Sequence, residues 1–332
     1  MPDELRVASL GLGWWGKDLA RAASDTGRIR IVSCFARTPE TREEFADAHG
    51  CRAAGSLDEL LGDDEVEAVL IATSHDSHRE LIEAAASAGK HVFVEKPLTL
   101  SVEDGRAAVD AAREAGIVLQ VGHQRRRAPA NRAIRALIDD GSIGDIQMVE
   151  ANHSLPNGFR MPSEAWRWNP DQSPLGSMTS LGIHQIESFM YLAGSIAGVS
   201  AVTRPGRGEV TIDEATALLF DFESGAVGTL LSSFFTPWNI TLAVHGTDGA
   251  AFSDGDGTRL EFQERQARQR TPRELPDVDP VADQLVEFAD AVRGSTIPEV
   301  GGEEGLEVVV ALMAASESVR QGRRVPLDEI RR

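Results

Sequence analysis

The chain has 332 residues, enough for two domains, and its 42% hydrophobic and 26% charged residues are typical of a globular protein. Its 52 acidic residues outnumber 33 basic ones, and the net charge of −19 opposes binding to nucleic acid or to an anionic membrane. The two cysteines, Cys34 and Cys51, form neither a disulfide framework nor a CxxC motif. No apolar run is long enough to span a bilayer. We therefore expect a cytoplasmic protein with a small-molecule partner.

The first third of the chain alternates short apolar runs with amphipathic helical patterns, as parallel βαβ units require. Expected strands cover residues 6–10, 29–35, 68–73, 91–95 and 118–122, and expected helices cover 15–23, 39–49, 77–88 and 101–115. Ser56 and Glu59 are spaced as a capping box for a further short helix. Parallel strands joined by helices predict a doubly wound Rossmann domain over residues 1–125.

The remaining residues, 126–332, predict a second α/β domain with a mainly antiparallel sheet. A helix at 129–139 precedes the expected strands, which cover 146–154, 199–204, 215–222, 225–235, 239–246 and two short segments up to 262. Residues 264–280 are polar and contain several prolines, so we expect an exposed loop there. Two helices, at 280–293 and 303–321, close the chain.

A glycine-rich turn, Gly11-Leu12-Gly13-Trp14-Trp15-Gly16, directly follows the first strand and opens the first helix. In this context the first glycine permits the turn, the second lets the backbone approach a pyrophosphate, and the third lets helix and strand pack closely. Amides at the helix N-terminus can then receive the phosphates. The turn therefore predicts a bound NAD or NADP.

The end of the second strand, Ala36-Arg37-Thr38, is where NAD sites usually carry an acid for the ribose 2′-hydroxyl. No carboxylate stands there to repel a 2′-phosphate, and Arg37 and Thr38 could bind one. The pattern favours NADP over NAD. The alternative is that Arg37 is solvated and Thr38 only caps the following helix.

The buried strand at 91–95 ends in Glu95-Lys96-Pro97. Open α/β sheets bind ligands at this carboxyl end, where desolvation can lower the pKa of a lysine towards the range useful for proton transfer. Pro97 fixes its own φ and restrains Lys96. Taken alone, the tripeptide could also be a pair of surface charges.

With these segments, the sequence resembles the Gfo/Idh/MocA family of oxidoreductases, which includes glucose-fructose oxidoreductase and inositol dehydrogenases. The similarity covers nearly the whole chain, and Glu-Lys-Pro is its most specific element. It rests on the glycine turn, Ala72-Thr73 with His78, Glu95-Lys96-Pro97, Gly122-His123-Gln124-Arg125-Arg126, Gly182-Ile183-His184, and the closing-helix segments Phe288-Ala289-Asp290-Ala291 and Glu303-Glu304-Gly305-Leu306.

The resemblance implies a Rossmann domain followed by an α/β domain whose open, mostly antiparallel sheet mediates homo-dimers or homo-tetramers. It implies hydride transfer between nicotinamide and a sugar, cyclitol or related secondary alcohol. Lys96 would be the proton donor or acceptor, Glu95 would lie near the nicotinamide ribose and orient Lys96, and His184 would be a second proton-transfer or hydrogen-bonding group across the substrate.

The candidate site residues fall into three groups. The catalytic candidates are Lys96 and His184. Cofactor contacts are expected from Gly11, Gly13, Trp14, Trp15, Gly16, Ala36, Arg37, Thr38, Thr73, Ser74, His78, Glu95 and Lys96. Substrate contacts are expected from Lys96, Gln124, Arg125, Trp166, Arg167, Ser180 and His184. No metal site is expected, because His75 and His78 lack further ligands at a recognisable spacing.

One departure from the family pattern concerns Ser180, where the family commonly has an aspartate four residues before the histidine. A serine can hydrogen-bond but supplies no negative charge, so more of the acid–base work would rest on Lys96 and His184. Trp166-Arg167-Trp168 could be a substrate wall or a hydrophobic anchor for a long loop.

These features predict an NAD(P)-dependent dehydrogenase or reductase acting on a sugar-like secondary alcohol or its ketone. Two alternatives stay open. One is a dihydrodiol dehydrogenase acting on a cyclic diol, and the other is a dinucleotide-sensing regulatory protein that has lost catalysis.

Overall fold

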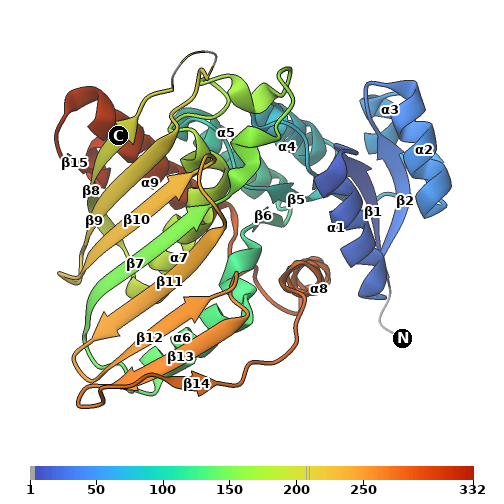
Figure 1. The fold of residues 1–332 in the computed structure, drawn as a ribbon. Helices are drawn as coiled ribbons and strands as arrows, with labels where there is room; N and C mark the ends of the chain where they lie inside the picture. The colour runs from blue at the N-terminus through green and yellow to red at the C-terminus, as the bar shows by residue number, and fades with distance from the viewer. Residues whose placement is uncertain (1–3, 207, 209) are drawn as a thin grey trace. The chain divides into compact units, whose positions relative to one another are not determined.

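The computed structural model describes residues 4–206, 208 and 210–332 (Figure 1). The chain divides into two compact units, and neither is one continuous segment. The first contains Met1–Gln124 with Asp279–Val309, and the second contains Arg125–Val278 with Val310–Arg332. The sequence suggested one boundary near residue 125, whereas the structure groups residues 279–309 with the first unit.

The first unit has a six-stranded parallel sheet in the order β3-β2-β1-β4-β5-β6 among the described residues. Its strands are β1 (Leu5–Leu10), β2 (Ile29–Phe35), β3 (Arg52–Ala53), β4 (Ala68–Ile71), β5 (His91–Glu95) and β6 (Leu119–Gly122). The order reverses between β1 and β4, which is the position at which Rossmann folds bind dinucleotides. The predicted doubly wound class is confirmed.

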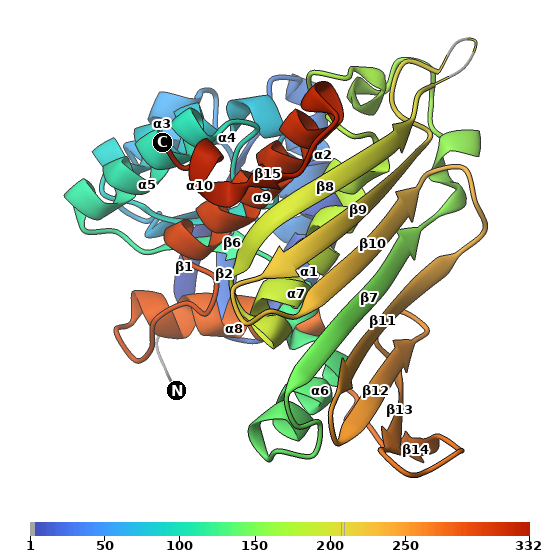
Figure 2. The same cartoon turned by 90° about the vertical axis from the view of Figure 1, so that its left-hand side faces the viewer.

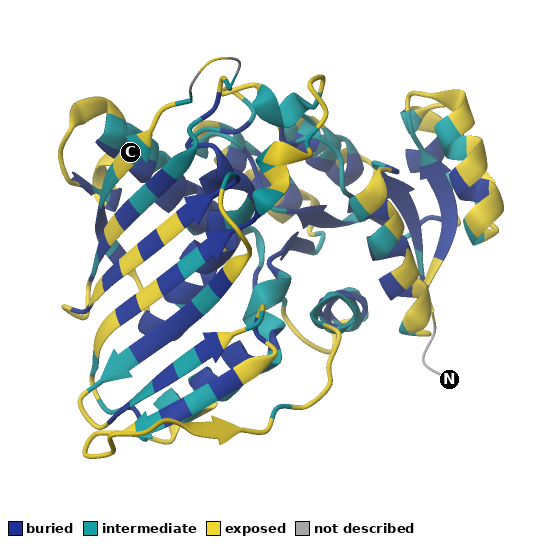
Figure 3. Cartoon of the chain, in the orientation of Figure 1, coloured by how far each residue is buried: buried dark blue, intermediate teal, exposed yellow. Residues whose placement is uncertain are grey.

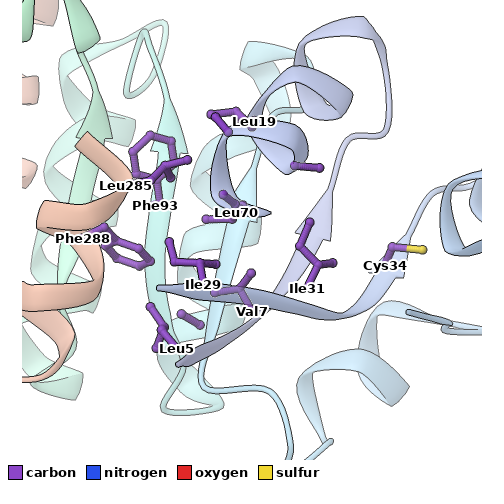
Figure 4. Close-up of a cluster of buried hydrophobic side chains, with 14 of the residues drawn as sticks. Leu5, Val7, Leu19, Ile29, Ile31, Cys34, Leu70, Phe93, Leu285 and Phe288 are labelled. Carbon is purple, nitrogen blue, oxygen red and sulfur yellow. The ribbon is translucent and has the colours of Figure 1, made fainter. Parts of the chain in front are cut away.

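Helices connect these strands and supply much of the buried core (Figure 4). They are α1 (Trp14–Asp25), α2 (Pro39–His49), α3 (Leu57–Leu61), α4 (His78–Ser87), α5 (Val102–Ala115) and α8 (Pro280–Val292). Leu285 and Phe288 of α8 pack into this core, and the ring of Phe288 meets that of Phe93 edge-on at 5.8 Å. An ion pair of 2.5 Å between Arg28 and Asp290 adds to this packing, which explains why α8 groups with the first unit.

The second unit is built on a nine-stranded sheet in the order β14-β13-β12-β11-β7-β10-β9-β8-β15 among the described residues (Figures 1 and 2). Its strands are β7 (Ile146–Ser154), β8 (Ile196–Arg204), β9 (Ala215–Phe222), β10 (Val227–Ser233), β11 (Asn239–Gly246), β12 (Gly249–Asp254), β13 (Arg259–Glu264), β14 (Thr271–Arg273) and β15 (Val325–Pro326). Only the β7–β10 pair among these is parallel, so the mostly antiparallel prediction is confirmed.

The two faces of this sheet differ in burial (Figure 3). Leu218, Phe220 and Leu230 are buried on the inner face, as the alternation of side chains along a strand allows. Helices of this unit include α6 (Pro129–Asp139), α7 (Ile183–Ala193) and α10 (Leu327–Ile330). Helix α9 (Gly302–Gln321) is divided between the units, and its residues from Val310 onward belong to the second. On the opposite face, Leu219 and Leu231 are half exposed.

Several local elements differ from the sequence prediction. The expected loop at 264–280 contains the edge strand β14, which tolerates Pro272 because an edge strand needs fewer backbone donors. The short strand β15 was not predicted. A π-helical turn, η5 (Met178–Gly182), precedes α7, and this too was not predicted. Across the described ranges, no helix combines the length and apolar character needed to cross a membrane.

Candidate active site

The glycine turn between β1 and α1 shows why each glycine stands where it does. Gly11 has a φ of +89°, and a Cβ there would lie 2.6 Å from the backbone nitrogen of Thr73. A Cβ on Gly16 would collide with the carbonyl oxygen of Gly11. A Cβ on Gly13, in contrast, would meet nothing within 4 Å. Gly11 and Gly16 are therefore needed for packing, while Gly13 leaves open space that fits an approaching pyrophosphate.

The N-terminus of α1 carries no protein group that would compete with a phosphate. Gly13 is the N-cap residue, no side chain caps the helix, and its first turn contains no acid. The partial positive charge of the helix end is thus available to an anion. Trp14 is 71% exposed beside it, and Trp15 meets the Trp14 ring at 5.3 Å.

The turn after β2 presents Arg37 and Thr38 to solvent. Thr38 is the N-cap residue of α2, as expected, but its hydroxyl makes no capping hydrogen bond. Arg42 supports the turn from behind, because its guanidinium donates to the carbonyl oxygens of Ala36 and Gly55 at 3.3 Å each. The two residues predicted to bind a 2′-phosphate, Arg37 and Thr38, are therefore accessible.

Glu95 ends β5 with its carboxyl group buried, at 5% exposure. Burial raises its pKa to about 7, although the positive charge of Lys96 and the indole N–H of Trp15 oppose this rise. Gly122 lies opposite Glu95 on β6, where a Cβ would come within 2.6 Å of the Glu95 Oε1. Lys96 is half-buried at the strand end, and the Lys96–Pro97 peptide bond is cis. The missing side chain of Gly122 makes the space that the carboxyl group occupies.

His78 supports this strand end from α4. Its ring is fully buried, and its Nδ1 lies 2.9 Å from the carbonyl oxygen of Pro97. Because a carbonyl only accepts hydrogen bonds, Nδ1 carries the proton, and burial lowers the pKa of the ring. This geometry favours a supporting role over direct contact with a cofactor. Nearby, the Thr73 and Ser77 hydroxyls bond at 2.7 Å, and Ser77 also donates to the Ser74 carbonyl.

In the second unit, His184 lies in the first turn of α7 and is buried. Its ring stacks on that of His153 from β7 at 5.8 Å with an interplanar angle of 25°. Ser180, also buried, lies in the π-helical turn η5, a feature that often marks functional sites. His153 was not among the predicted site residues, although its place on the buried face of an alternating strand was a usable signal.

A buried ion pair lies one turn further along α7. The Arg126 guanidinium donates to Glu187 at 2.6 Å, and the Glu187 side chain is only 1% exposed. Arg126 also lies over the Tyr191 ring at 4.6 Å. The sequence analysis did not anticipate this pair, because Arg126 and Glu187 are 61 residues apart.

Among the remaining predicted substrate residues, Arg125 and Arg167 are held by protein contacts. Arg125 forms an ion pair with Asp256, and Gln124 precedes it in the short 3₁₀ helix η2 (Gln124–Arg127). Arg167 lies over the Trp166 ring at 4.2 Å, and burial lowers its pKa.

Trp168, the third member of this aromatic segment, donates from its indole nitrogen to the Pro162 carbonyl at 2.8 Å and packs near Phe235. These contacts favour the anchor interpretation for Trp168.

The structure thus assembles two groups of predicted residues. In the first unit, the glycine turn, Thr73, Glu95 and Lys96 gather at the carboxyl ends of β1, β4 and β5. In the second, His184 stacks on His153, and Ser180 lies four residues before His184 in the turn η5. No cluster of three or more potential metal-binding side chains occurs in the part of the chain that the structure describes. The first group fits a dinucleotide, and the second offers imidazole and hydroxyl groups for a polar substrate.

Comparison with known proteins gives consistent results for both parts of the chain. Residues 5–123 match a family model described as an oxidoreductase family with an NAD-binding Rossmann fold, and residues 131–252 match the GFO/IDH/MocA C-terminal domain. A 1,5-anhydro-D-fructose reductase from Ensifer adhaerens is 28% identical, over 90% of this chain and 91% of that protein.

Two further relatives were found. A 4-carboxy-2-hydroxymuconate-6-semialdehyde dehydrogenase from a Sphingobium species is 31% identical, over 69% of this chain and 72% of its own length. A crystal structure of an oxidoreductase described as NADPH-dependent, from Desulfitobacterium hafniense, superimposes with a TM-score of 0.95 at 29% identity, with both chains covered completely.

Proposed function

The chain belongs to the Gfo/Idh/MocA oxidoreductase family, and from that membership we propose that it transfers a hydride between NAD(P) and a secondary alcohol or ketone of a sugar, cyclitol or related polyol. The observation that carries this proposal is the placement of Glu95 and Lys96 at the carboxyl end of β5, on the same edge of the sheet as the glycine turn. A relative named 1,5-anhydro-D-fructose reductase supports a sugar-like substrate.

In the proposed reaction, the nicotinamide supplies or accepts the hydride when the cofactor is bound. Lys96 accepts the hydroxyl proton at its Nζ during oxidation and returns it to the carbonyl oxygen during reduction. Glu95 orients Lys96, and His184 donates a second hydrogen bond or transfers a proton to the substrate. Ser180 contributes a hydroxyl without charge, so Lys96 and His184 carry the proton chemistry.

Replacing Lys96 with methionine tests the central step. We expect Lys96→Met to bind NADP(H) normally and to lose about 10²-fold or more in turnover, the usual contribution of general acid–base catalysis. Lys90→Met is the matched control, because Lys90 precedes the opposite end of the same strand and donates to the carbonyl of Asp63. Near-normal turnover of Lys96→Met would remove Lys96 from the mechanism.

We further propose that NADP is preferred over NAD. Arg37 is exposed, and the Thr38 hydroxyl makes no capping hydrogen bond, so both are suited to bind a 2′-phosphate. No carboxylate stands in the same turn. Arg37→Ala should lower the ratio of kcat/KM for NADP to that for NAD by about tenfold, which corresponds to ~1.4 kcal/mol. Arg30→Ala, on the exposed side of the same strand, is the control. Activity of the unaltered protein with NAD alone would contradict the proposal.

The substrate proposal needs a panel that separates it from its alternatives. Sugars, cyclitols and cyclic dihydrodiols would each be tested for cofactor reduction. Turnover of a sugar or cyclitol supports the main proposal, turnover restricted to dihydrodiols favours the second enzyme class, and cofactor binding without any turnover favours a regulatory protein. The cytoplasmic location stays a prediction.

We also propose that the open sheet of the second unit forms a homo-dimer or homo-tetramer. Val202, Leu219 and Leu231 are between 50% and 73% exposed on one face of neighbouring strands, where they form an apolar surface suited to a second copy. Leu231→Glu should therefore reduce the molar mass measured by light scattering. Ile297→Glu, at an exposed position in the first unit, should leave it unchanged. A monomeric unaltered protein would contradict the proposal.

A further inference from the structure

A buried amide near the start of α6 is hydrogen-bonded to both η2 and α7 in the second unit. Asn131, the third residue of α6, is only 5% exposed. Its Nδ2 donates to the backbone carbonyl oxygen of Arg125 at 2.8 Å and to the Ser188 hydroxyl oxygen at 3.1 Å. An amide nitrogen has two hydrogens, so these two bonds use its full donor capacity. Asn131 therefore links two segments that are distant in the sequence.

The Ser188 hydroxyl extends this link to a candidate catalytic residue. Ser188 is completely buried on α7, and its Oγ donates to the backbone carbonyl oxygen of His184 at 2.9 Å. Because the Ser188 oxygen accepts from Asn131 and donates to His184, the three residues form one directed chain of hydrogen bonds. His184 lies where the π-helical turn η5 meets α7, and among the described residues no side chain caps this helix. The chain of hydrogen bonds therefore supports the backbone at that junction.

The residues at the two ends of this chain, Arg125 and His184, were both predicted to contact the substrate. The Arg125 carbonyl oxygen also accepts from the backbone nitrogen of Ala128 at 3.0 Å. The His184 ring stacks on His153 of β7 at 5.8 Å. The ring of His184 is thus positioned from the sheet, whereas its backbone is positioned from α6 through Ser188.

We propose that Asn131 is a positioning residue, which fixes the backbone of Arg125 and that of His184 relative to each other. The inference rests on the proposed function, in which both side chains contact the substrate. If the amide is removed, the Arg125 carbonyl keeps the Ala128 donor and the His184 carbonyl keeps the Ser188 donor. The loss therefore loosens the arrangement without leaving either carbonyl unpaired. A small misplacement of groups that hold a substrate is enough to slow its reaction.

The first test is structural and needs neither cofactor nor substrate. Asn131→Leu keeps the approximate size of the side chain and removes both donors. Ile134→Val is the matched control, because it loosens a buried position of the same helix and leaves these hydrogen bonds in place. Histidine ring signals are recorded by NMR, and His184→Ala identifies the signal of His184. We expect Asn131→Leu and Ser188→Ala to shift this signal, and Ile134→Val to leave it where it is.

The second test measures turnover of the polyol or sugar that the unaltered protein uses best. Asn131→Leu should lower kcat/KM for this substrate by about tenfold and leave the Kd for NADPH unchanged. Ile134→Val should leave both quantities unchanged. The double variant Asn131→Leu with Ser188→Ala should lose no more than the weaker of the two single variants, because both residues act through one chain of hydrogen bonds.

Three results would overturn the proposal. The first is an unshifted His184 signal in Asn131→Leu, and the second is a shifted signal with unchanged kcat/KM. The third is an equal loss of kcat/KM in Asn131→Leu and Ile134→Val, which is what a purely structural role predicts. If the unaltered protein transfers no hydride to any polyol, the proposed function fails, whereas the NMR comparison still decides whether Asn131 positions His184.

Discussion

Glu95→Gln tests whether burial controls the charge of the Glu95 carboxyl group. The folded protein holds the Glu95 pKa at about 7, against an ordinary 4.5, because burial destabilises the carboxylate more than Lys96 and Trp15 stabilise it. A pKa raised by folding adds stability that is fully present below the unfolded value and is lost as the pH rises through the folded value. The difference of about 2.5 pH units corresponds to ~3 kcal/mol of unfolding free energy.

The assay is urea unfolding of the unaltered protein and of Glu95→Gln between about pH 5 and pH 8. The difference between their unfolding free energies cancels the other titrating groups, and glutamine cannot ionise. Across that range we expect the unaltered protein to lose about 2 to 3 kcal/mol of unfolding free energy relative to Glu95→Gln, and the difference to level off only as the pH approaches 8. A difference that does not change with pH would refute the reasoning, as would one that moves in favour of the unaltered protein.

The remaining predictions concern packing and ion pairing. Gly13→Ala should change the free energy of unfolding by less than about 0.5 kcal/mol yet weaken NADPH binding about tenfold, because a Cβ there meets only open space. Gly16→Ala should destabilise the fold or prevent folding. Equal effects of the two variants on thermal unfolding would contradict the different roles given to Gly13 and Gly16. Arg126→Met should lower the free energy of unfolding by about 3 kcal/mol, because it removes the Arg126 charge from the buried Glu187 carboxylate, whereas Arg135→Met, from an exposed pair, should lower it by under about 1 kcal/mol. Similar losses in urea unfolding would count against burial as the cause. Phe288→Ala should lower the free energy of unfolding in urea by about 3 to 5 kcal/mol, and Phe288→Met should lower it much less. A small effect of Phe288→Ala would show that α8 contributes little to the core.

Most of the first unit could be predicted because its signals are local. A buried parallel strand reads as a short apolar run, and the glycine turn identifies the strand that it follows. Strand β5 and helix α2 occur at the predicted residues. The grouping of α8 with this unit could not be predicted from the sequence, because it depends on Phe288 packing against Phe93, 195 positions earlier in the chain. Sequence spacing carries no information about such a contact.

Less of the second unit could be predicted from the sequence, for a related reason. Its alternating strands could be located, yet the ion pair between Arg126 and Glu187 and the stacking of His153 on His184 join separate elements. The π-helical turn around Ser180 has no pattern that distinguishes it from the start of an ordinary helix. The sequence therefore located the helices and strands better than it located the contacts between them.

The environment of Glu95 shows how a short motif depends on residues outside it. A strand buried on both faces places its last side chain in a dry environment, and Gly122 on the neighbouring strand leaves room for the carboxyl group. A larger residue at position 122 would push the carboxyl group away, and the cause of its raised pKa would change. Lys96 lies one residue further on, half-buried, and its charge opposes the effect of burial on Glu95. The protonation of Glu95 is therefore set by the geometry of β5 and β6, since a glutamate at the end of an exposed strand would keep an ordinary pKa.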